Sequence, residues 1–199
     1  MQGKLEGVDC VAAVSGIGKV NAAMCAQTMI LRYHPPADYQ YRCGRRHGGK
    51  ELKISDIVVA DSVVQHDMDT SDLGDPKGFI SGIDRIQIPC DEELNDKVRA
   101  AAGAVEGLAC HQGIIATGDQ FVGSKDKLNR LMEEFGAVAC EMEGGSIGQV
   151  CYINKVPFTV VRAISDNAND DAHMDYPKFL KIAVKKSFEL LTELMPLLA

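Results

Sequence analysis

The chain has 199 residues, 46% of them hydrophobic, and a formal net charge of −7 at pH 7. A chain of this length buries about 70% of the surface that its unfolded form exposes, so we expect one domain over residues 1–199. The acidic balance disfavours a nucleic-acid binder, because phosphate backbones select clustered Lys and Arg. No apolar run approaches the ~18 residues that span a bilayer, so no membrane partner is expected.

The seven cysteines are odd in number, never spaced as C-x-x-C, and mostly placed in apolar runs such as VDCVAAV. This usage is typical of the reduced cytosol. The N-terminus MQGKLEGVD lacks the charged-then-apolar pattern of a secretion signal. We therefore expect a cytoplasmic protein.

Short β-branched runs alternate with longer segments of helical period. This alternation predicts an α/β fold, a three-layer α/β/α domain with a mixed, mostly buried central sheet. Asp91 and Ser124 are the predicted N-caps of two helices. The predicted strands are Val8–Val14, Asp56–Gln65, Gln112–Ala116, Ala137–Cys140 and Phe158–Ile164, and the predicted helices are Lys19–Arg32, Asp91–Ala104, Lys125–Phe135, Glu143–Cys151 and Tyr176–Leu197.

The first predicted strand leads into SGIGKVNAA, which opens a helix and suggests a phosphate-binding loop. A Walker loop also needs a Gly five positions before the Gly-Lys pair and a Ser or Thr after it, where this chain has Ala13 and Val20. The glycines of this segment are therefore interpreted as residues of a tight turn.

The segment YQYRCGRRHGGK, residues 39–50, is unusually basic for an acidic chain. As a nucleic-acid patch it has no further basic surface to extend it. As a metal site it offers Cys43 and His47 at i, i+4, with no evident third or fourth ligand. We expect no metal and no cofactor.

Two carboxylates follow the strand that ends at Cys140, in the sequence Glu141-Met142-Glu143-Gly144. Alternate residues of a strand point the same way, so both Glu side chains can face one crevice. Alone, this pair would favour a solvated helix start, where the macrodipole stabilises acids.

Further polar residues follow two other strands. The strand Phe158–Ile164 contains Arg162, and a buried Arg is costly unless an acid or an anionic ligand pairs with it. Asp166 lies just past this strand, where open sheets hold ligands, although an Asp there is also typical of an Asx turn. The segment 118–122, Gly-Asp-Gln-Phe-Val, follows a third strand. The combined set suits an uncharged ring and a polyol.

Five segments, SGIGKVNAA, DIVVADSVVQHDMD, ATGDQFV, VACEMEGGSIGQVC and VPFTVVRAISDNA, occur in an order and spacing that resemble the 5'-methylthioadenosine/S-adenosylhomocysteine nucleosidases of the nucleoside phosphorylase superfamily. The resemblance runs from about residue 3 to the C-terminus. It implies hydrolysis of the N-glycosidic bond of thioadenosine nucleosides to adenine and a thioribose, in methionine salvage.

The resemblance implies roles on the adenine side of such a site. Asp166 would protonate or hydrogen-bond the adenine N7, and Ser165 would orient it. Val122 would offer main-chain hydrogen bonds to the adenine edge while Phe121 packs on the ring.

On the sugar side, the resemblance implies that Glu143 binds the ribose hydroxyls and that Met142 lies against the sugar. Glu141 and Arg162 would line the side of the nucleophilic water. The remaining implied features are Tyr176 near the ribose and alkylthio group, and a Met68–Ile80 loop that reaches into the partner's pocket of a homodimer.

The chain departs from the family pattern in two places. The family's first strand, with the glutamate that activates the water, would precede Met1, so we expect this strand to be missing. Where the family has a segment resembling IINTGxAGG, this chain has DYQYRCGRRHGG. Suitable codons for residues 38–48, read one base later, give IINTGVAGGM. Our hypothesis is that residues 39–47 are a locally frame-shifted translation, entered near Ala37 and corrected near Gly49.

Three alternatives stay open at this point. A phosphorolytic relative would use phosphate in place of water. An impaired nucleoside-binding pseudo-enzyme would follow from the two departures. A structural or signalling module would leave Arg162 and the two glutamates without a task.

Overall fold

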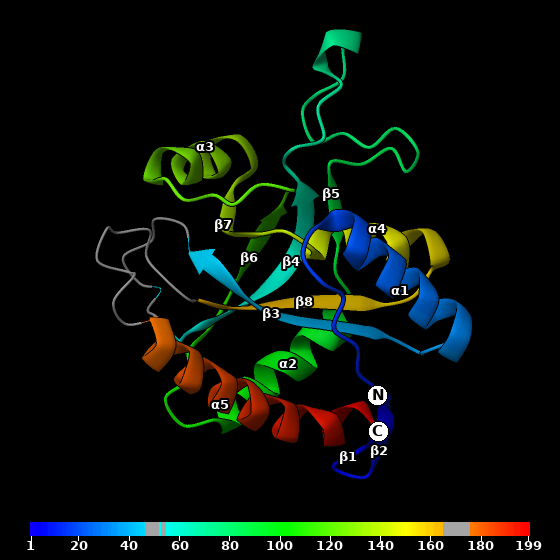
Figure 1. The fold of residues 1–199 in the computed structure, drawn as a ribbon, viewed down its shortest axis with the longest axis vertical. Coiled ribbons are helices and arrows are strands. Elements are labelled where there is room, and N and C mark those ends of the chain that lie inside the picture. Colours follow the sequence, from blue (N-terminus) through cyan, green and yellow to red (C-terminus); the bar gives the residue numbers. More distant parts are fainter. Residues whose placement is uncertain (47–51, 53–54, 165–175) are drawn as a thin grey trace.

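The computed structural model describes residues 1–46, 52, 55–164 and 176–199. Its elements in chain order are β1 (Gln2–Leu5), β2 (Val8–Val11), α1 (Lys19–Tyr33), β3 (Asp38–Arg46), β4 (Ile57–Gln65), η1 (Ser71–Leu73), β5 (Gln87–Pro89), α2 (Glu92–Ala104), β6 (Cys110–Thr117), α3 (Lys125–Phe135), β7 (Ala137–Glu141), α4 (Gly144–Asn154), β8 (Phe158–Ile164), α5 (Tyr176–Leu194) and η3 (Met195–Leu198). The predicted α/β class is confirmed (Figure 1).

The central sheet is mixed and has the strand order β5-β4-β6-β7-β3-β8. Strands β4, β6 and β7 are parallel to one another, and β3 is parallel to β8. The sheet closes on itself, because the first residues of β4 also pair antiparallel with the last residues of β8, from Ile57↔Ala163 to Val59↔Val161. The last residues of β3 pair with the ends of both β8 and β7, and so bring these two ends together.

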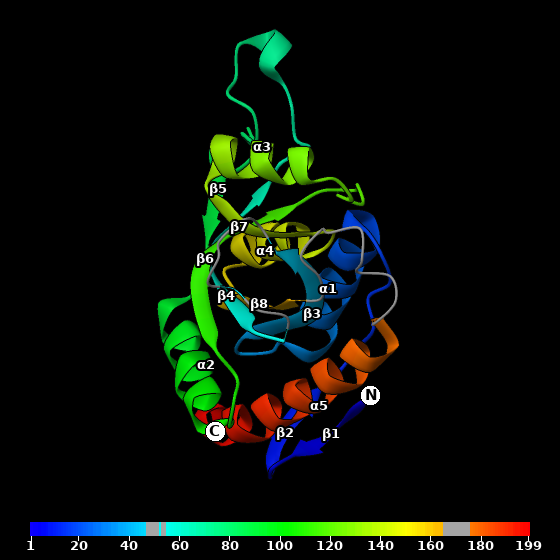
Figure 2. The same cartoon turned by 90° about the vertical axis from the view of Figure 1, so that its left-hand side faces the viewer.

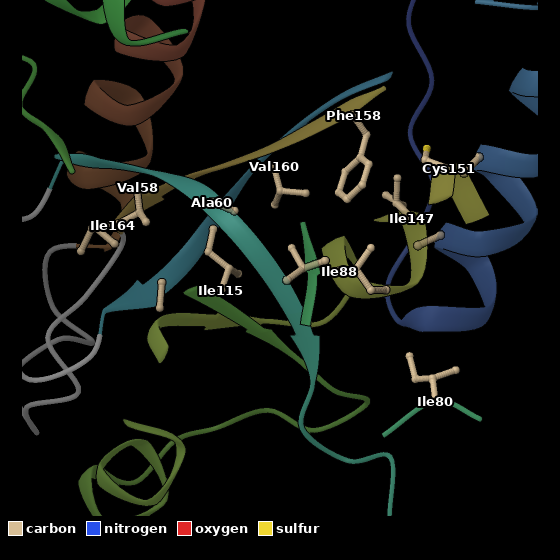
Figure 3. Packing of buried hydrophobic residues seen from close by; sticks show 14 of the residues in the cluster. Val58, Ala60, Ile80, Ile88, Ile115, Ile147, Cys151, Phe158, Val160 and Ile164 are labelled. Carbon is tan, nitrogen blue, oxygen red and sulfur yellow. The ribbon is translucent and has the colours of Figure 1, made fainter. Parts of the chain in front are cut away.

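Alternate residues of β4 serve two different cores. Val58 and Ala60 pack in the cluster formed with α1 and α4, whereas Ile57 and Val59 pack in the cluster formed with α2 and α5. Helices α1 and α4 lie on one side of β3 and β8, with α2 and α5 on the other (Figures 1 and 2). Figure 3 shows the first cluster, in which Val58, Ala60, Ile115 and Val160 lie among the strands.

The helix boundaries follow local signals that the sequence contains. Asp91 caps α2 by accepting a hydrogen bond from Leu94 N at 2.9 Å, and Ser124 caps α3 through Lys127 N at 3.3 Å, so both predicted caps are confirmed. Gly136, in the left-handed region with φ 69°, ends α3.

The first predicted strand occupies a different place from the other four. Instead of joining the central sheet, Val8–Val11 pairs antiparallel with Gln2–Leu5 in a separate two-stranded sheet. Three of its residues are only partly buried, and Asp9 is exposed. The sequence analysis did not predict β1 or β5 at all.

The stretch that the sequence analysis singled out as basic contains a strand of the central sheet. β3 pairs with β8 from Asp38↔Phe158 to Gly44↔Ile164, and its end pairs antiparallel with β7 at Arg45↔Cys140 and Arg46↔Ala139. It therefore lies between the strand that carries Arg162 and the strand that ends at Glu141.

Candidate active site

A buried ion pair joins the ends of β7 and β8. Arg162 Nη2 contacts Glu141 Oε2, and the two residues are 0% and 8% exposed. Arg162 Nη1 also donates to Val161 O at 3.0 Å. The expectation that an acid pairs with the arginine in this strand is confirmed, and Glu141 is that acid.

The first turn of α4 folds around the Glu141 carboxylate. Glu143 N donates to Oε2 at 2.8 Å, Gly144 N lies within 2.9 Å of both carboxylate oxygens, and the Thr117 hydroxyl donates to Oε1. The carboxylate thus accepts from a helix N-terminus, where the macrodipole favours an anion. A Cβ at Gly144 would lie 2.9 Å from Val160 Cγ1 and 3.2 Å from Glu141 Oε1, so the carboxylate fits under this turn because residue 144 is glycine.

These contacts determine the charge state of Glu141. Burial by itself raises the pKa of this carboxyl, but Arg162, the Thr117 hydroxyl and the Gly144 amide together lower it below its ordinary value. Glu141 is therefore an ionised anchor for Arg162 and for the start of α4, rather than a group that exchanges protons near neutral pH.

The second carboxylate of the motif has different surroundings. Glu143 is the N-cap of α4 and is 1% exposed. Its Oε1 accepts a hydrogen bond from Gly18 N at 2.9 Å, in the turn that precedes α1. The motif thus divides its two carboxylates between two tasks, because Glu141 contacts the sheet and Glu143 contacts the SGIGK turn. Met142 lies between them and is half-buried.

The segment after β6 presents an exposed aromatic side chain. Phe121 is 71% exposed, while Val122 is 5% exposed and packs in the cluster beneath α3 with residues such as Leu128. A buried valine anchors the segment, so the neighbouring ring stands at the surface near the end of the strand that carries Thr117.

Three predicted site positions fall at the limits of the described residues. Ser165 and Asp166 lie outside them and follow directly after Ile164, which is 0% exposed and ends β8. Tyr176 is the first residue of α5, and its side chain also lies outside the described part.

Sequence reasoning missed several residues that support the site. The Thr117 hydroxyl also accepts a hydrogen bond from Gly145 N at 2.6 Å, so it links the end of β6 to α4. Lys19, Asp67 and Asp119 form a network at the same ends of the strands. The signal that could have found them is their position, since each lies within three residues of a predicted strand end or at a predicted helix start.

His66, directly after β4, is a further missed residue. Its Nε2 is buried and has no hydrogen-bond partner among the described residues. It lies so close to residue 118 that a Cβ there would be 2.3 Å from Nε2, so Gly118 provides the space for the ring. Burial lowers the pKa of His66, and Lys19 adds to this effect against the opposing field of Asp67. Among the described residues, no group of three or more His, Cys, Asp or Glu is arranged to hold a metal.

These features define a class of protein: an α/β domain whose strand ends gather a buried ion pair, a second buried carboxylate and an exposed aromatic ring. The family model of the phosphorylase superfamily matches residues 1–196.

Individual relatives agree with this match. The 5'-methylthioadenosine/S-adenosylhomocysteine nucleosidase of Geobacillus thermodenitrificans is 35% identical over 195 residues, which cover 97% of this chain and 81% of that protein. A mutant of the Helicobacter pylori nucleosidase, solved with 5'-methylthioadenosine in the active site, aligns with a TM-score of 0.89 at 35% identity, over 98% of this chain and 83% of that one. A futalosine hydrolase mutant of Helicobacter pylori aligns with the same TM-score and identity, over 98% and 84%.

The chain belongs to the phosphorylase superfamily and, within it, to the family of 5'-methylthioadenosine/S-adenosylhomocysteine nucleosidases.

Proposed function

We propose that this protein hydrolyses the N-glycosidic bond of 5'-methylthioadenosine and S-adenosylhomocysteine, releasing adenine and a thioribose. The observation that carries this proposal is the buried Glu141–Arg162 pair next to the buried Glu143, at the end of the strand that leads into Ser165 and Asp166. The relatives that are nucleosidases by name support the substrate class.

The sugar side needs groups that bind hydroxyls and aim a water. Cleavage of the C1'–N9 bond passes through an oxocarbenium-like sugar. The enzyme must therefore neutralise the leaving purine on one side of the sugar and orient the attacking water on the other. Arg162 Nε is buried and has no hydrogen-bond partner among the described residues, so it is a donor suited to the water or to a sugar oxygen. Glu143 binds the ribose hydroxyls, with Met142 packed against the sugar ring.

Glu141 acts through other groups in this mechanism. Its oxygens accept from Arg162, Thr117 and two main-chain amides, and its pKa is lowered. It therefore fixes the guanidinium of Arg162 on the water's side and keeps it paired. The proton for the leaving adenine comes from Asp166 instead, a contribution typically worth about 10²- to 10⁴-fold in rate.

The adenine side requires a ring platform and main-chain hydrogen-bonding groups. Phe121 is exposed and supplies the ring, while the buried Val122 gives its segment a fixed position. Ser165 orients Asp166, and Tyr176 contacts the ribose and the alkylthio group.

We further propose a homodimer in which the Met68–Ile80 loop of each subunit reaches the pocket of the other. This loop projects from the body of the protein beyond α3 (Figures 1 and 2), and Leu73 near its tip is 83% exposed. An apolar side chain on a projecting loop suits a pocket that accepts an alkylthio group. We place the protein in the cytoplasm, in methionine salvage; none of the helices in the described ranges has the length and apolar character of a membrane span.

Adenine release tests this function. Purified protein is incubated with 5'-methylthioadenosine, S-adenosylhomocysteine or 5'-deoxyadenosine, with and without phosphate, and free adenine and sugar products are separated by chromatography. We expect adenine from the first two substrates without phosphate, and loss of turnover in an Arg162→Met variant. A phosphate requirement would indicate a phosphorylase instead. Absence of adenine from every substrate would contradict the proposal.

The matched control is Glu93→Gln, which removes an exposed pair with Lys97 on α2. This variant should keep full turnover, since exposed i, i+4 pairs contribute only about 0.3 to 0.5 kcal/mol to stability.

A further inference from the structure

Four segments that are far apart in the sequence meet at the N-terminus of α1. They are the turn Gly18-Lys19, Asp67 after β4, Asp119 after β6, and Glu143 at the start of α4. The proposed reaction assigns no task to three of these segments, although they adjoin residues that it does use.

Asp67 links the first three segments through both of its oxygens. Lys19 Nζ donates to Asp67 Oδ1 at 2.6 Å, and Asp119 N donates to Asp67 Oδ2 at 2.8 Å. Asp119 in turn accepts from Lys19 N at 2.7 Å through its own Oδ1. The three residues thus form a closed ring of hydrogen bonds, which fixes their relative positions more firmly than any single contact would.

Two members of the ring, Lys19 and Asp67, are largely shielded from solvent, whereas Asp119 is exposed. The side chains of Lys19 and Asp67 are 20% and 14% exposed. Burial raises the pKa of Asp67, but the Lys19 ammonium and the Asp119 amide more than offset this effect, so the pKa is lowered and the carboxylate is charged. Removal of one partner from a mostly buried pair leaves the other charge uncompensated, which costs far more than the loss of an exposed pair.

The turn before α1 connects this ring of hydrogen bonds to Glu143 in the proposed site. Gly18 has φ +89°, in the left-handed region, and a Cβ at this position would lie 2.8 Å from Asp119 Oδ1. Glycine therefore lets the main chain approach Asp119 closely and turn its amide toward Glu143 Oε1, at 2.9 Å. The Gly18 amide is held between the ring on one side and Glu143 on the other.

We propose that Lys19, Asp67 and Asp119 are positioning residues: their ring of hydrogen bonds holds the Gly18 amide against Glu143 and holds the Phe121 segment at the same end of the sheet. This inference rests on the proposed function, in which Glu143 binds the ribose hydroxyls. Asp119 lies two residues before Phe121, and Asp67 directly precedes the Met68–Ile80 loop, so one ring sets the geometry of two parts of its own pocket and of the loop proposed to reach the partner's pocket.

A double-mutant cycle tests whether the ring acts through Glu143. Asp67→Asn keeps the shape of the side chain but removes its charge, and we expect kcat/KM for 5'-methylthioadenosine to fall about 10- to 100-fold, as for a displaced binding group. In a Glu143→Gln background the same change should cost less than about twofold, because the group it positions is already altered. Lys19→Arg should recover part of the activity that Lys19→Met loses. Additive losses in the cycle would overturn the proposal.

Amide exchange provides a readout that needs no turnover. Asp67→Asn should speed hydrogen exchange at the amides of Gly18, Lys19 and Asp119 by at least about tenfold, while Glu93→Gln leaves them unchanged. Glu143→Gln should affect Gly18 alone among the three. Unchanged protection in Asp67→Asn would overturn the ring even if the protein proved to lack nucleosidase activity, and a wild-type protein without turnover would overturn only the proposed function.

Discussion

Strands β8 and β3 are parallel neighbours in one sheet, yet they differ in how their buried polar side chains are paired. All residues of β8 are buried, and its arginine is paired with Glu141. In β3, the Tyr39 hydroxyl and Gln40 Oε1 are buried and have no hydrogen-bond partner among the described residues. Each unsatisfied buried group costs about 1 to 3 kcal/mol, whereas paired groups contribute to stability. β8 also leaves one such atom, Arg162 Nε, but the charge of its arginine is paired, whereas β3 leaves two neutral polar groups without a partner in the described part of the chain and so fits a buried strand less well.

This conflict supports the hypothesis that residues 39–47 are a frame-shifted translation. Gln40 pairs in register with Val160, and Tyr39 packs against the cluster formed with α2 and α5. The alternative reading frame supplies Ile at positions 38 and 39, which has no polar side-chain atom to satisfy, and Asn at position 40. A strand that keeps its length and its pairing but acquires polar side chains is the expected result of such a shift.

The largest expected effect comes from breaking the buried ion pair between Arg162 and Glu141. Arg162→Met leaves the Glu141 carboxylate buried without its partner, so we expect the free energy of unfolding to fall by about 3 to 5 kcal/mol in urea titrations. The double variant Arg162→Met/Glu141→Gln should recover part of this loss, because no buried charge remains. Equal destabilisation in the single and double variants would argue against an ion pair in the folded state.

A second test replaces β3, the strand in which the buried polar atoms of Tyr39 and Gln40 lack partners among the described residues. Replacing residues 38–47 with IINTGVAGGM should raise the free energy of unfolding by several kcal/mol, since each buried polar group removed recovers about 1 to 3 kcal/mol. Nucleosidase turnover should rise with it. The coding DNA is an independent check: it should contain a pair of compensating insertions and deletions relative to close relatives, and their absence would reject the frame-shift hypothesis.

A smaller effect is expected from Tyr39→Phe, which removes the unpartnered hydroxyl and leaves the ring. The variant should be about 1 kcal/mol more stable than the wild type in urea. The matched control is Tyr152→Phe, because the Tyr152 hydroxyl accepts from Arg85 Nε at 2.8 Å and its loss should give no gain. A destabilised Tyr39→Phe variant would indicate that the hydroxyl is satisfied in solution.

The smallest effect concerns pH, where Asp38 in β3 and Glu141 in β7, the partner of Arg162, contribute to stability with opposite signs. Burial raises the pKa of Asp38 above its ordinary value of 3.8, so its contribution to stability is present below pH 3.8 and is lost as pH rises through the raised pKa. Glu141, whose pKa is lowered from 4.5, contributes stability above pH 4.5 that is lost as pH falls. Asp38→Asn should therefore stabilise the protein at pH 7 and have no effect at pH 3, as measured by thermal unfolding across this range. A gain of equal size at both pH values would contradict the raised pKa.

The sequence predicted the elements whose residues carry their own local signal. β8 was predicted with its observed bounds because six apolar or β-branched residues surround a single Arg. α3 was predicted because a serine cap precedes a strong helical period. The predicted strand Val8–Val14 was placed with the strands of the central sheet, since a short β-branched run looks the same in a buried strand and in a partly exposed hairpin.

At the site, sequence patterns identified residues but not their partners. The buried Arg162 was predicted to pair with an acid or an anionic ligand, and the structure pairs it with Glu141. In contrast, the different roles of Glu141 and Glu143 depend on which main-chain amides surround each carboxylate. No spacing in the sequence indicates these contacts. The ring of Lys19, Asp67 and Asp119 is likewise assembled from three distant segments, because the parallel pairing of β4 and β6 sets their ends side by side next to the start of α1.

That closure has a consequence for the behaviour of the protein outside its native state. Because β4 pairs with both β6 and β8, the short β5, which ends in a proline, is the open side of the sheet among the described strands. β3 completes the circuit between β7 and β8. If β3 detached, β7 and β8 would each expose a row of unpaired main-chain groups, which are templates for intermolecular strand addition. β3, whose polar side chains fit its buried position poorly, is therefore also the strand that covers the main-chain groups through which this chain could aggregate.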